Sequence, residues 1–423
     1  MKHFLCPCLF LCLFVFSAPA ADAQQTYSLK QCLETGLERN YSIRIVRNDE
    51  VVTKNNATPG HAGYLPSADL STGFSGTQEA EAANAGVSVV WTIFDGFGIQ
   101  AEYARLKELR TLGALNTRLA VEDLIAEISG EYYNLIRQGT RLGNLSSTLA
   151  LSRERLRIVE ERYSIGSMSR LDLQQAQVDF NADSSALLNQ LEMVHRSRTN
   201  LNRLMGAENP EELVLLKDST ISPNAFLDEA ELWKRTMETN VSLLIAQRNT
   251  GLSRLDLKKA QSRNYPYLRL NAGYTYTTNW VGMTGLAPRW GASYGLTVGF
   301  SLFDGFNRKR EQRNARLQIE NTELQRRELE LSLRTEMSNQ WMAYENNLNL
   351  WSLEKENRVA AQENFRIAIE RYRLGDLSGI QLREAQNSLL NAEERQSIAE
   401  FATKLCEISL LQLSGQLTDF LLR

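Results

Sequence analysis

The chain repeats itself at a fixed spacing, and this repeat restricts the fold more than any other feature of its 423 residues. The Phe-Asp-Gly-Phe sequence at 94–97 recurs at 303–306, the Arg-Tyr-x-x-Gly sequence at 162–166 recurs at 371–375, and the Leu-x-Gly sequence at 204–206 recurs at 413–415. All three pairs are separated by 209 residues. A constant offset at three distant sites indicates a duplication, so the fold must consist of two similar halves.

The same order of elements is predicted for both halves. Upstream of the strands the offset is 200 residues, because Asn40 corresponds to Asn240 and Pro66 to Pro266. The expected organisation is a signal peptide at 1–23, a first repeat at 24–209, an inter-repeat linker at 210–226 and a second repeat at 227–423. The linker is expected in the equatorial region, about halfway along the helices. Each repeat begins with a helix, at about 28–57 and about 227–262, and ends with a return helix, at about 169–205 and about 378–413.

Two stretches in each half alternate as strands do, at about 65–95 and about 266–304. In the second half Tyr294, Leu296, Val298, Phe300 and Leu302 alternate with glycine, threonine and serine. Period-two alternation over about ten residues is typical of transmembrane β-barrels, and aromatic residues near the strand ends fit a membrane interface. A soluble sandwich with one buried face is the alternative. A single hairpin per half favours the barrel.

A very long helix follows the strands in each half, at about 97–164 and about 306–373, and no proline interrupts either segment. At 1.5 Å per residue each helix would be about 100 Å long, which no compact globular domain accommodates. Leu317, Leu324 and Leu331 keep a heptad spacing, and charged residues fill most gaps. The pattern predicts coiled-coil packing with solvated faces.

The N-terminus predicts export. Residues 1–23 combine a charged start, an apolar run and a small-residue end, which together form a signal peptide cleaved before Gln24. An uncleaved anchor is the alternative, but the apolar run is short for a membrane span. Beyond it no apolar run approaches the roughly 18 residues of a spanning helix, so the exported chain is either soluble or a β-barrel protein. Cys32 and Cys406 remain after cleavage, and the sequence leaves open whether they form a disulfide.

The number of strands implies an oligomer. One chain supplies two hairpins, and four strands leave open edges that a bilayer does not tolerate. The smallest transmembrane barrels have about eight strands, so two chains supply eight and three supply twelve. The predicted fold is mainly α with a β-barrel part, in two tandem repeats that each contain a helical hairpin with very long helices and a β-hairpin.

The doubled motifs resemble the TolC family of outer-membrane efflux ducts. The resemblance rests on the Asn-x-Ser helix starts, the proline before each first strand, the two Phe-Asp-Gly junctions and the Leu-x-x-Ala-Gln sequences at 173–177 and 382–386, and it covers nearly all of 24–423. It implies a homotrimer whose twelve-stranded barrel in outer-membrane lipid continues into a periplasmic α-helical tunnel. It also implies docking to a periplasmic adaptor and an inner-membrane transporter.

The tunnel entrance is expected at the two turns between long and return helices. These adaptor-docking turns are Ile165, Gly166, Ser167 and Met168 in the first repeat and Leu374, Gly375, Asp376 and Leu377 in the second. Glycine allows the chain to reverse tightly, and exposed apolar residues beside it would meet the tip of an adaptor. A solvated turn without a partner is the alternative.

The resemblance further implies a periplasmic gate. Aligned on the turn glycines, Asp172 and Tyr372 correspond to a family pair that holds the entrance shut, and a hydrogen bond from hydroxyl to carboxylate suits that role. The two acidic ring positions of the family fall on Gln381 and Glu384, of which only Glu384 is acidic. The family arginine that pairs with the first carboxylate falls on Leu377, so this clamp would be weaker or differently built. Ordinary solvated helix surface is the alternative.

These features favour a passive outer-membrane duct for small toxic compounds or drugs. A duct for type I protein secretion has the same architecture, and a pore-less periplasmic coiled-coil scaffold is an alternative of another class. No phosphate-binding G-x-x-x-x-G-K-[ST] loop is visible, which agrees with a duct energised by partner proteins.

The sequence lacks the residues that other functions would require. The 47 basic and 50 acidic residues give a net charge of −3, without the basic excess of a nucleic-acid-binding protein. Only His3, His61 and His195 are present, and no nucleophile signature accompanies them. The sequence therefore predicts neither an enzyme nor a metal or cofactor site.

Overall fold

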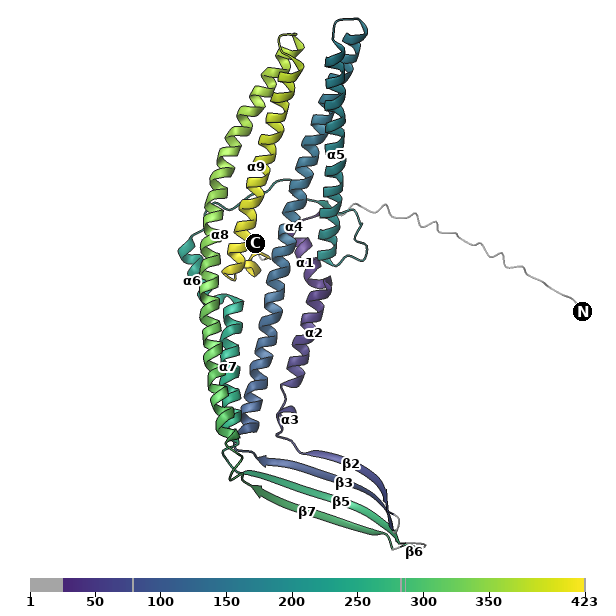
Figure 1. Cartoon of the computed structure of the whole chain (residues 1–423), viewed down its shortest axis with the longest axis vertical. Helices are drawn as coiled ribbons and strands as arrows, with labels where there is room; N and C mark the ends of the chain where they lie inside the picture. Colours follow the sequence, from purple (N-terminus) through teal and green to yellow (C-terminus); the bar gives the residue numbers. More distant parts are fainter. Residues whose placement is uncertain (1–25, 78–79, 282–283, 286, 422–423) are drawn as a thin grey trace, which may run out of the picture.

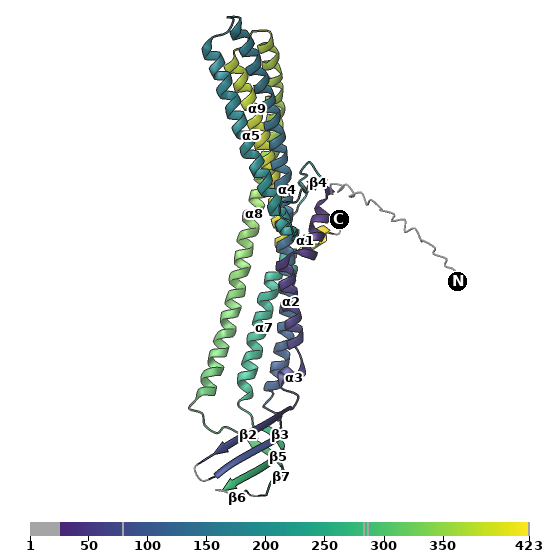
Figure 2. The ribbon, with the colours of Figure 1, turned by 90° about the vertical axis from the view of Figure 1, so that its right-hand side faces the viewer.

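The computed structural model describes residues 26–77, 80–281, 284–285 and 287–421. A small sheet lies at one end of an elongated molecule, and long helices extend from it to the other end (Figure 1). In the orthogonal view the sheet and the helices still follow one another along the same axis (Figure 2). The expected signal peptide at 1–23 lies outside the described residues.

Both β-hairpins join in one antiparallel sheet. Its long strands follow the order β2 (Ser67–Gly76), β3 (Ala80–Phe94), β5 (Tyr267–Val281) and β7 (Arg289–Gly299), and the short β6 (Thr284–Gly285) pairs with the end of β5. The contact between β3 and β5 joins the two repeats. Among the described residues β2 and β7 each have a partner on one side only, so their outer backbone groups form two edges.

The register separates apolar from polar side chains. Leu270 pairs with Trp91 on one side and with Leu296 on the other, and successive residues of a strand point to opposite faces. The apolar face carries Leu70, Phe74, Val87, Val89, Trp91, Leu268, Leu270, Tyr274, Tyr276, Trp290, Tyr294, Leu296 and Val298. The opposite face carries Asp69, Ser71, Ser88, Thr92, Arg269, Asn271, Thr275, Arg289, Ser293 and Thr297. The alternation in the sequence thus becomes a two-faced sheet.

The last strand is shorter than its pattern suggests. The alternation predicts a strand through Phe300 and Leu302, and the structure places both beyond β7. Gly299 pairs with Tyr267, the first residue of β5. Pro266 precedes it and has no N–H to donate, so β7 ends where its partner ends.

The helices form two hairpins of unequal arms. The long arms α4 (Gly98–Ser164) and α8 (Asn307–Arg373) have 67 residues each, and they return as α5 (Arg170–Met205) and α9 (Gly379–Leu413). The other helical segments are α1 (Leu29–Arg39), α2 (Tyr41–Asn56), α3 (Pro59–Ala62), α6 (Glu229–Thr239), α7 (Val241–Ser262) and the 3₁₀ segment η1 (Leu417–Leu421). Towards the sheet α2 packs on α4 and α7 on α8, whereas α5 and α9 take these places towards the free ends (Figure 1).

Equivalent asparagines join each short helix to the end of a return helix. The Asn40 side chain accepts from the backbone of α2 and donates to the Leu204 carbonyl at 2.9 Å. Asn240 caps α7 in the same way and donates to the Leu413 carbonyl at 3.0 Å. Each side chain satisfies backbone groups at two helix ends, so two stacked helices match one long helix.

The Phe-Asp-Gly sequences turn strand into helix. Phe97 and Phe306 have φ values of 73° and 61°, the left-handed region that non-glycine residues rarely adopt. The side chain of Asp95 accepts from the N–H of Ile99 at 3.0 Å, and Asp304 accepts from the N–H of Arg308 at 3.0 Å. These aspartates supply the acceptors that the first helical turn lacks.

The linker between the repeats is tied to the helices at mid-height (Figure 1). Tyr132 of α4 donates its hydroxyl to the Asp218 carboxylate at 2.7 Å. Glu407 of α9 accepts from the N–H of Asn224 at 2.9 Å. A two-residue parallel pair, β1 (Thr26–Tyr27) with β4 (Leu215–Leu216), lies beside these contacts. The linker thereby bridges both helical hairpins.

Both cysteines that follow the expected signal peptide are free thiols. Cys32 is fully buried in the core of α1, α4 and α5, and Cys406 lies in a separate cluster with Met337 and Tyr344. Burial raises the pKa of the Cys32 thiol to about 12, so it stays protonated at neutral pH. Within the described residues, no helix combines the length and the apolar character of a membrane span.

Candidate functional site

Both helical hairpins end in the same glycine turn. Gly166 and Gly375 have φ values of 76° and 81°. Each glycine N–H donates to the carbonyl three residues earlier, and the next N–H donates to the carbonyl five residues earlier, which is a Schellman ending. An added Cβ would meet nothing within 4 Å at either glycine. The positive φ, rather than a lack of space, therefore favours glycine.

The apolar residue before each glycine lies in solvent. Ile165 and Leu374 are 80% and 84% exposed. Met168 and Leu377 are half-buried, and Leu377 packs on the cluster that contains Tyr372. The Ser167 hydroxyl donates to a helix carbonyl, and Asp376 accepts from Arg371 at 2.9 Å. The turns are thus hydrogen-bonded within themselves and present two aliphatic side chains at the free end.

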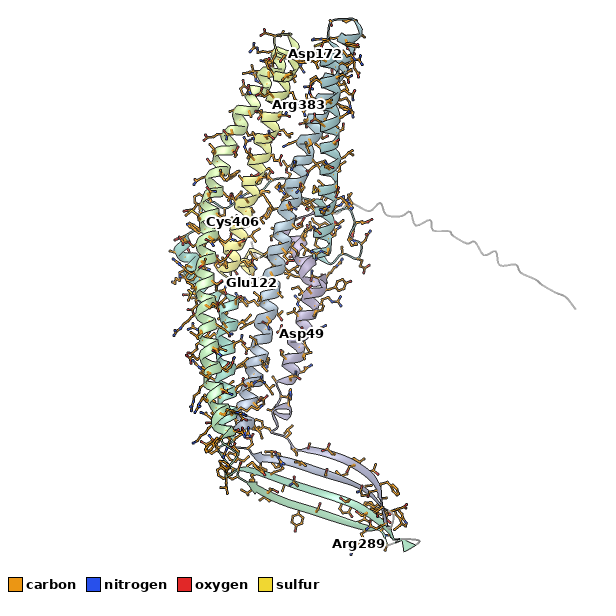
Figure 3. All side chains as sticks on the ribbon, viewed as in Figure 1. Asp49, Glu122, Asp172, Arg289, Arg383 and Cys406 are labelled. Atoms are coloured by element: carbon orange, nitrogen blue, oxygen red, sulfur yellow. The ribbon has the colours of Figure 1, made fainter. Side chains whose placement is uncertain are left out.

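The residue three positions after each capping serine closes a capping box. Asp172 accepts from the hydroxyl of Ser169 at 2.6 Å and from its N–H at 3.2 Å, and Gln381 accepts from Ser378 in the same way. These positions are 209 residues apart, so the two repeats begin their return helices alike. Asp172 therefore has a structural role near the free end, where Figure 3 labels it.

The structure does not bring the four predicted gate residues together within one chain. Tyr372 is 7% exposed and packs against Leu382 and Ala385 of its own hairpin. Within the described part of the chain no hydrogen bond joins Tyr372 to Asp172. Glu384 and Gln381 are exposed, one turn apart on α9.

Sequence reasoning missed a largely buried charge cluster near the free ends of the helical hairpins. Arg383 of α9 donates both terminal nitrogens to the two oxygens of Asp183 on α5, each at 2.7 Å. One turn away on α5, Asp179 pairs with Arg155 of α4 and accepts from Gln175 at 3.0 Å. The hydrogen bonds that Arg383 donates to the Asp183 carboxylate raise the pKa of the Arg383 guanidinium.

This cluster ties the two hairpins together. Arg383 and Asp183 are 200 residues apart, and their side chains are 17% and 7% exposed. The available signal was the pair of carboxylates at 179 and 183, which share one helix face with buried Ala176. Their arginine partners lie in other helices, so local spacing could not identify them.

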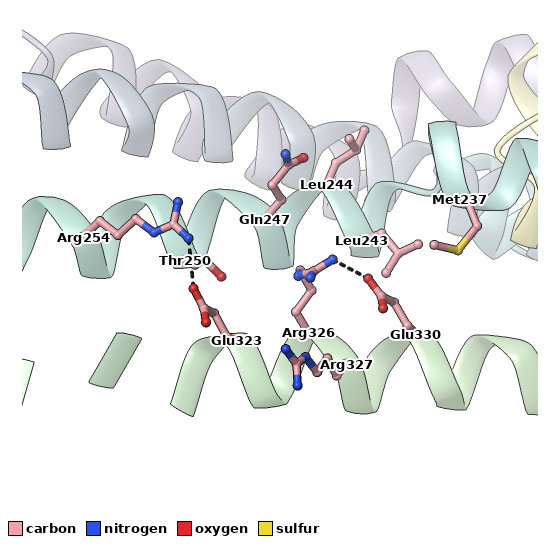
Figure 4. Close-up of a pocket in the computed structure, with 10 residues that line it drawn as sticks. All are labelled: Met237, Leu243, Leu244, Gln247, Thr250, Arg254, Glu323, Arg326, Arg327 and Glu330. Carbon is pink, nitrogen blue, oxygen red and sulfur yellow. Dashed lines mark hydrogen bonds and ion pairs between the residues drawn. The ribbon is translucent and has the colours of Figure 1, made fainter. Parts of the chain in front are cut away.

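A polar groove between α7 and α8 is the other candidate site (Figure 4). Arg254 pairs with Glu323 across it at 2.9 Å, and Arg326 pairs with Glu330 along α8. Its lining residues are Met237, Leu243, Leu244, Gln247, Thr250, Arg254, Glu323, Arg326, Arg327 and Glu330. Most charged side chains of the groove already pair with each other, so these residues mainly serve the contact between α7 and α8. No cluster of metal-ligating side chains occurs in the part of the chain that the structure describes.

Comparison with known protein families identifies the family to which this chain belongs. The model of the outer membrane efflux protein family matches residues 33–207 and again residues 233–416. The chain belongs to the outer membrane efflux protein family. The expected resemblance is thereby confirmed, and the double match follows the two repeats. Outer membrane efflux proteins act in transport, and the duplicated helical and β-hairpins of this member are the framework of that role.

Solved outer-membrane channels share the fold of this outer membrane efflux protein. The OprN channel superposes with a TM-score of 0.76 at 20% identity, covering 92% of this chain and 90% of OprN. The Campylobacter jejuni CmeC channel gives a TM-score of 0.77 at 13% identity, covering 92% and 85%. Protein CyaE of Bordetella pertussis (strain Tohama I) is 22% identical over 323 residues, which span 72% of this chain and 66% of that relative.

Removing one partner of the Arg383–Asp183 pair is expected to destabilise the protein by about 3–5 kcal/mol, because the other charge stays largely buried without its opposite charge. Asp183→Asn and Arg383→Gln test this in chemical denaturation followed by helical ellipticity. The double variant should lose less than the sum of the two single losses. The more exposed pair Arg141–Glu394, with side chains 43% and 31% exposed, is the control, and neutralising it should cost less than about 1 kcal/mol. Equal losses at both pairs would contradict the role of burial.

Proposed function

We propose that three copies of this chain form the outer-membrane duct of a tripartite efflux system and passively conduct small toxic compounds or drugs from the periplasm to the exterior. The observation that carries the proposal is one sheet of four long strands and the short β6, with an apolar and a polar face, two open edges and helices 67 residues long attached to it. A sheet of this kind satisfies its edge groups in lipid only by closing with other copies.

Closure follows from the two edges. β7 of one copy pairs with β2 of the next, and three copies give a ring of twelve strands. Such head-to-tail contacts close when the rotation between copies allows it. The apolar face then meets lipid and the polar face lines a water-filled passage. Each chain contributes one β-hairpin and one helical hairpin from the repeat at 24–209 and the same from the repeat at 227–423.

The helices support the same ring. α8 forms one edge of the chain and α2 with α5 the other, because α4, α7 and α9 lie between them. Leu317, Leu324 and Leu331 of α8 are 52%, 54% and 69% exposed, a leucine row left uncovered in a single chain. Ile45 of α2 is 59% exposed at the opposite edge. Joining these edges buries apolar surface and builds a periplasmic tunnel on the barrel.

The free ends of the hairpins are the proposed entrance. Ile165 and Leu374 would meet a periplasmic adaptor, through which an inner-membrane transporter supplies energy. Asp172 of one copy and Tyr372 of the next would form the clamp, since α5 and α8 lie at opposite edges of one chain. Three copies of Glu384 would place a ring of negative charge at the constriction and favour cations.

An outer-membrane duct must insert its sheet with the apolar face outward. Tyr294→Arg should prevent assembly in the outer membrane, because Tyr294 is the middle residue of β7 on the apolar face and a lipid-facing arginine at the bilayer midplane costs roughly 2–4 kcal/mol. Ser293→Arg, on the polar face of the same strand, should assemble normally. The measurements are membrane fractionation and heat-modifiable gel migration, followed by current steps of the purified protein in planar bilayers. A soluble periplasmic location of the unaltered protein would support a pore-less scaffold instead.

The clamp predicts a change in conductance. The Asp172→Ala, Tyr372→Phe double variant should raise the single-channel conductance in planar bilayers, because it removes the hydroxyl and the carboxylate of the proposed bond. Tyr163→Phe, the equivalent position of the first repeat, is the matched control and should conduct like the unaltered protein. Unchanged conductance of the double variant would reject the clamp.

A further inference from the structure

The start of α8 carries an excess of positive charge that the first repeat lacks. Residues 307–316 contain five basic residues and one acidic residue. The equivalent segment of the first repeat, residues 98–107, contains two basic residues and one acidic residue. The macrodipole of a helix disfavours cations at its N-terminus, so these charges do not serve the start of α8. An anionic partner outside the chain would explain them.

Most of this charge is left without a partner in the chain. Arg308 pairs with Asp304 at 3.1 Å, and the one acidic residue of the segment, Glu311, pairs with Arg263 of α7. The remaining four cations are exposed and, within the described ranges of the chain, form no ion pair: Lys309, Arg310, Arg313 and Arg316. We call these four residues the basic patch.

The basic patch begins one turn beyond the aromatic end of the sheet. Phe303 and Phe306 are exposed where β7 leads into α8 (Figure 1). Phe306 precedes Lys309 by three residues and Arg313 by seven, so its ring and these cations share one helix face, and the Lys309 Nζ lies 5.7 Å from the centre of the Phe306 ring. At 1.5 Å per residue the patch extends about 5–15 Å from Phe306. Aromatic rings mark the membrane interface, so the patch would lie at the depth of the lipid phosphates.

The basic patch faces the outside of the proposed tunnel. Arg334 follows Arg316 by 18 residues, or five helical turns, and therefore lies on the same face of α8. Its guanidinium lies 4.7 Å from the centre of the Trp233 ring in α6. Three copies of α6 would obstruct the passage if this face pointed inward. The opposite face of α8 is polar and uncharged over the same turns, with Asn314, Gln318, Asn321 and Gln325.

A cleft of about 530 Å³ lies beside the basic patch, between α4, α7 and α8. Gln312, one residue before Arg313, lines it together with the exposed Lys258 of α7. The rings of Phe97 and Tyr265 line it as well, and their centres lie 5.9 Å apart in an edge-to-face arrangement. A cation next to two aromatic rings suits the headgroup and glycerol region of a lipid.

We propose that the basic patch binds the phosphate groups of anionic phospholipids in the periplasmic leaflet of the outer membrane. The inference rests on the proposed duct, because it requires the sheet to lie in the bilayer. Clustered lysine and arginine side chains attract anionic headgroups at short range, and an arginine can donate two parallel hydrogen bonds to one phosphate. Three patches around the ring would fix the depth of the barrel in the membrane.

Lipid titration of the trimer in detergent tests the proposal. Phosphatidylglycerol, which is anionic, and phosphatidylcholine, which is zwitterionic, are added separately, and the bound lipids are counted by native mass spectrometry. The patch variant combines Lys309→Gln, Arg313→Gln and Arg316→Gln. Its affinity for phosphatidylglycerol should fall about fivefold for each charge removed, and its preference over phosphatidylcholine should disappear.

Two further variants separate the patch from net charge. Lys234→Gln, Lys355→Gln and Arg373→Gln together remove three exposed cations of α6 and α8 that, among the described residues, form no ion pair and lie farther from the sheet. This control should keep the preference for phosphatidylglycerol. The variant Arg313→Lys with Arg316→Lys keeps the charge of the patch and should bind phosphatidylglycerol nearly as the unaltered trimer does.

The outcomes distinguish this inference from the proposed duct. Equal binding of both lipids by the unaltered trimer, or an undiminished preference in the patch variant, would overturn the inference. If the patch variant dissociates, salt decides, because added salt should release phosphatidylglycerol from the unaltered trimer and binding that is independent of salt would overturn the inference. Failure of the unaltered protein to form trimers would instead overturn the duct, and this inference with it.

Discussion

Every backbone N–H and C=O group of a strand in hydrocarbon requires a hydrogen-bond partner, and β2 and β7 meet this requirement on one side only within a single chain. The remaining features of the molecule serve the same closure. The apolar face of the sheet continues across both repeats because β3 pairs with β5 in register over most of its length. The edge helices α8, α2 and α5 continue the two open edges away from the sheet, so one rotation would close strands and helices together.

Matching lengths make that continuity possible. A return helix of 35 or 36 residues cannot cover a long helix of 67, and a second helix must complete it. Asn40 and Asn240 join the segments because each side chain hydrogen-bonds to the start of one helix and to the end of another. Phe97 and Phe306, both with a left-handed backbone, lie at the junctions where the sheet meets the helices. Both devices occur in each repeat, which is why they were visible in the sequence as paired motifs.

The sequence predicted the features that occur in both repeats and missed the features that occur only once. The two hairpins, the glycine turns and the alternation of the strands all appear twice, and the family match and the structure confirm this architecture. The end of β7 depends on its partner strand, and the alternation through Phe300 and Leu302 carries no information about that partner. Arg383 and Asp183 meet over 200 residues and lack charged equivalents in the other repeat. A comparison of the repeats therefore passes over the contact that ties the hairpins together.

Asp172 shows a second limit of reading motifs. The resemblance assigns it to a gate, and the structure assigns its carboxylate to the capping box of α5. The two roles are compatible, since a carboxylate has acceptor positions beyond those that Ser169 uses. The gate depends on one property of the assembly, its number of chains. Native mass spectrometry of the protein released from detergent measures that number directly. The account predicts three chains per particle, and a monomer or a dimer as the stable species would contradict it.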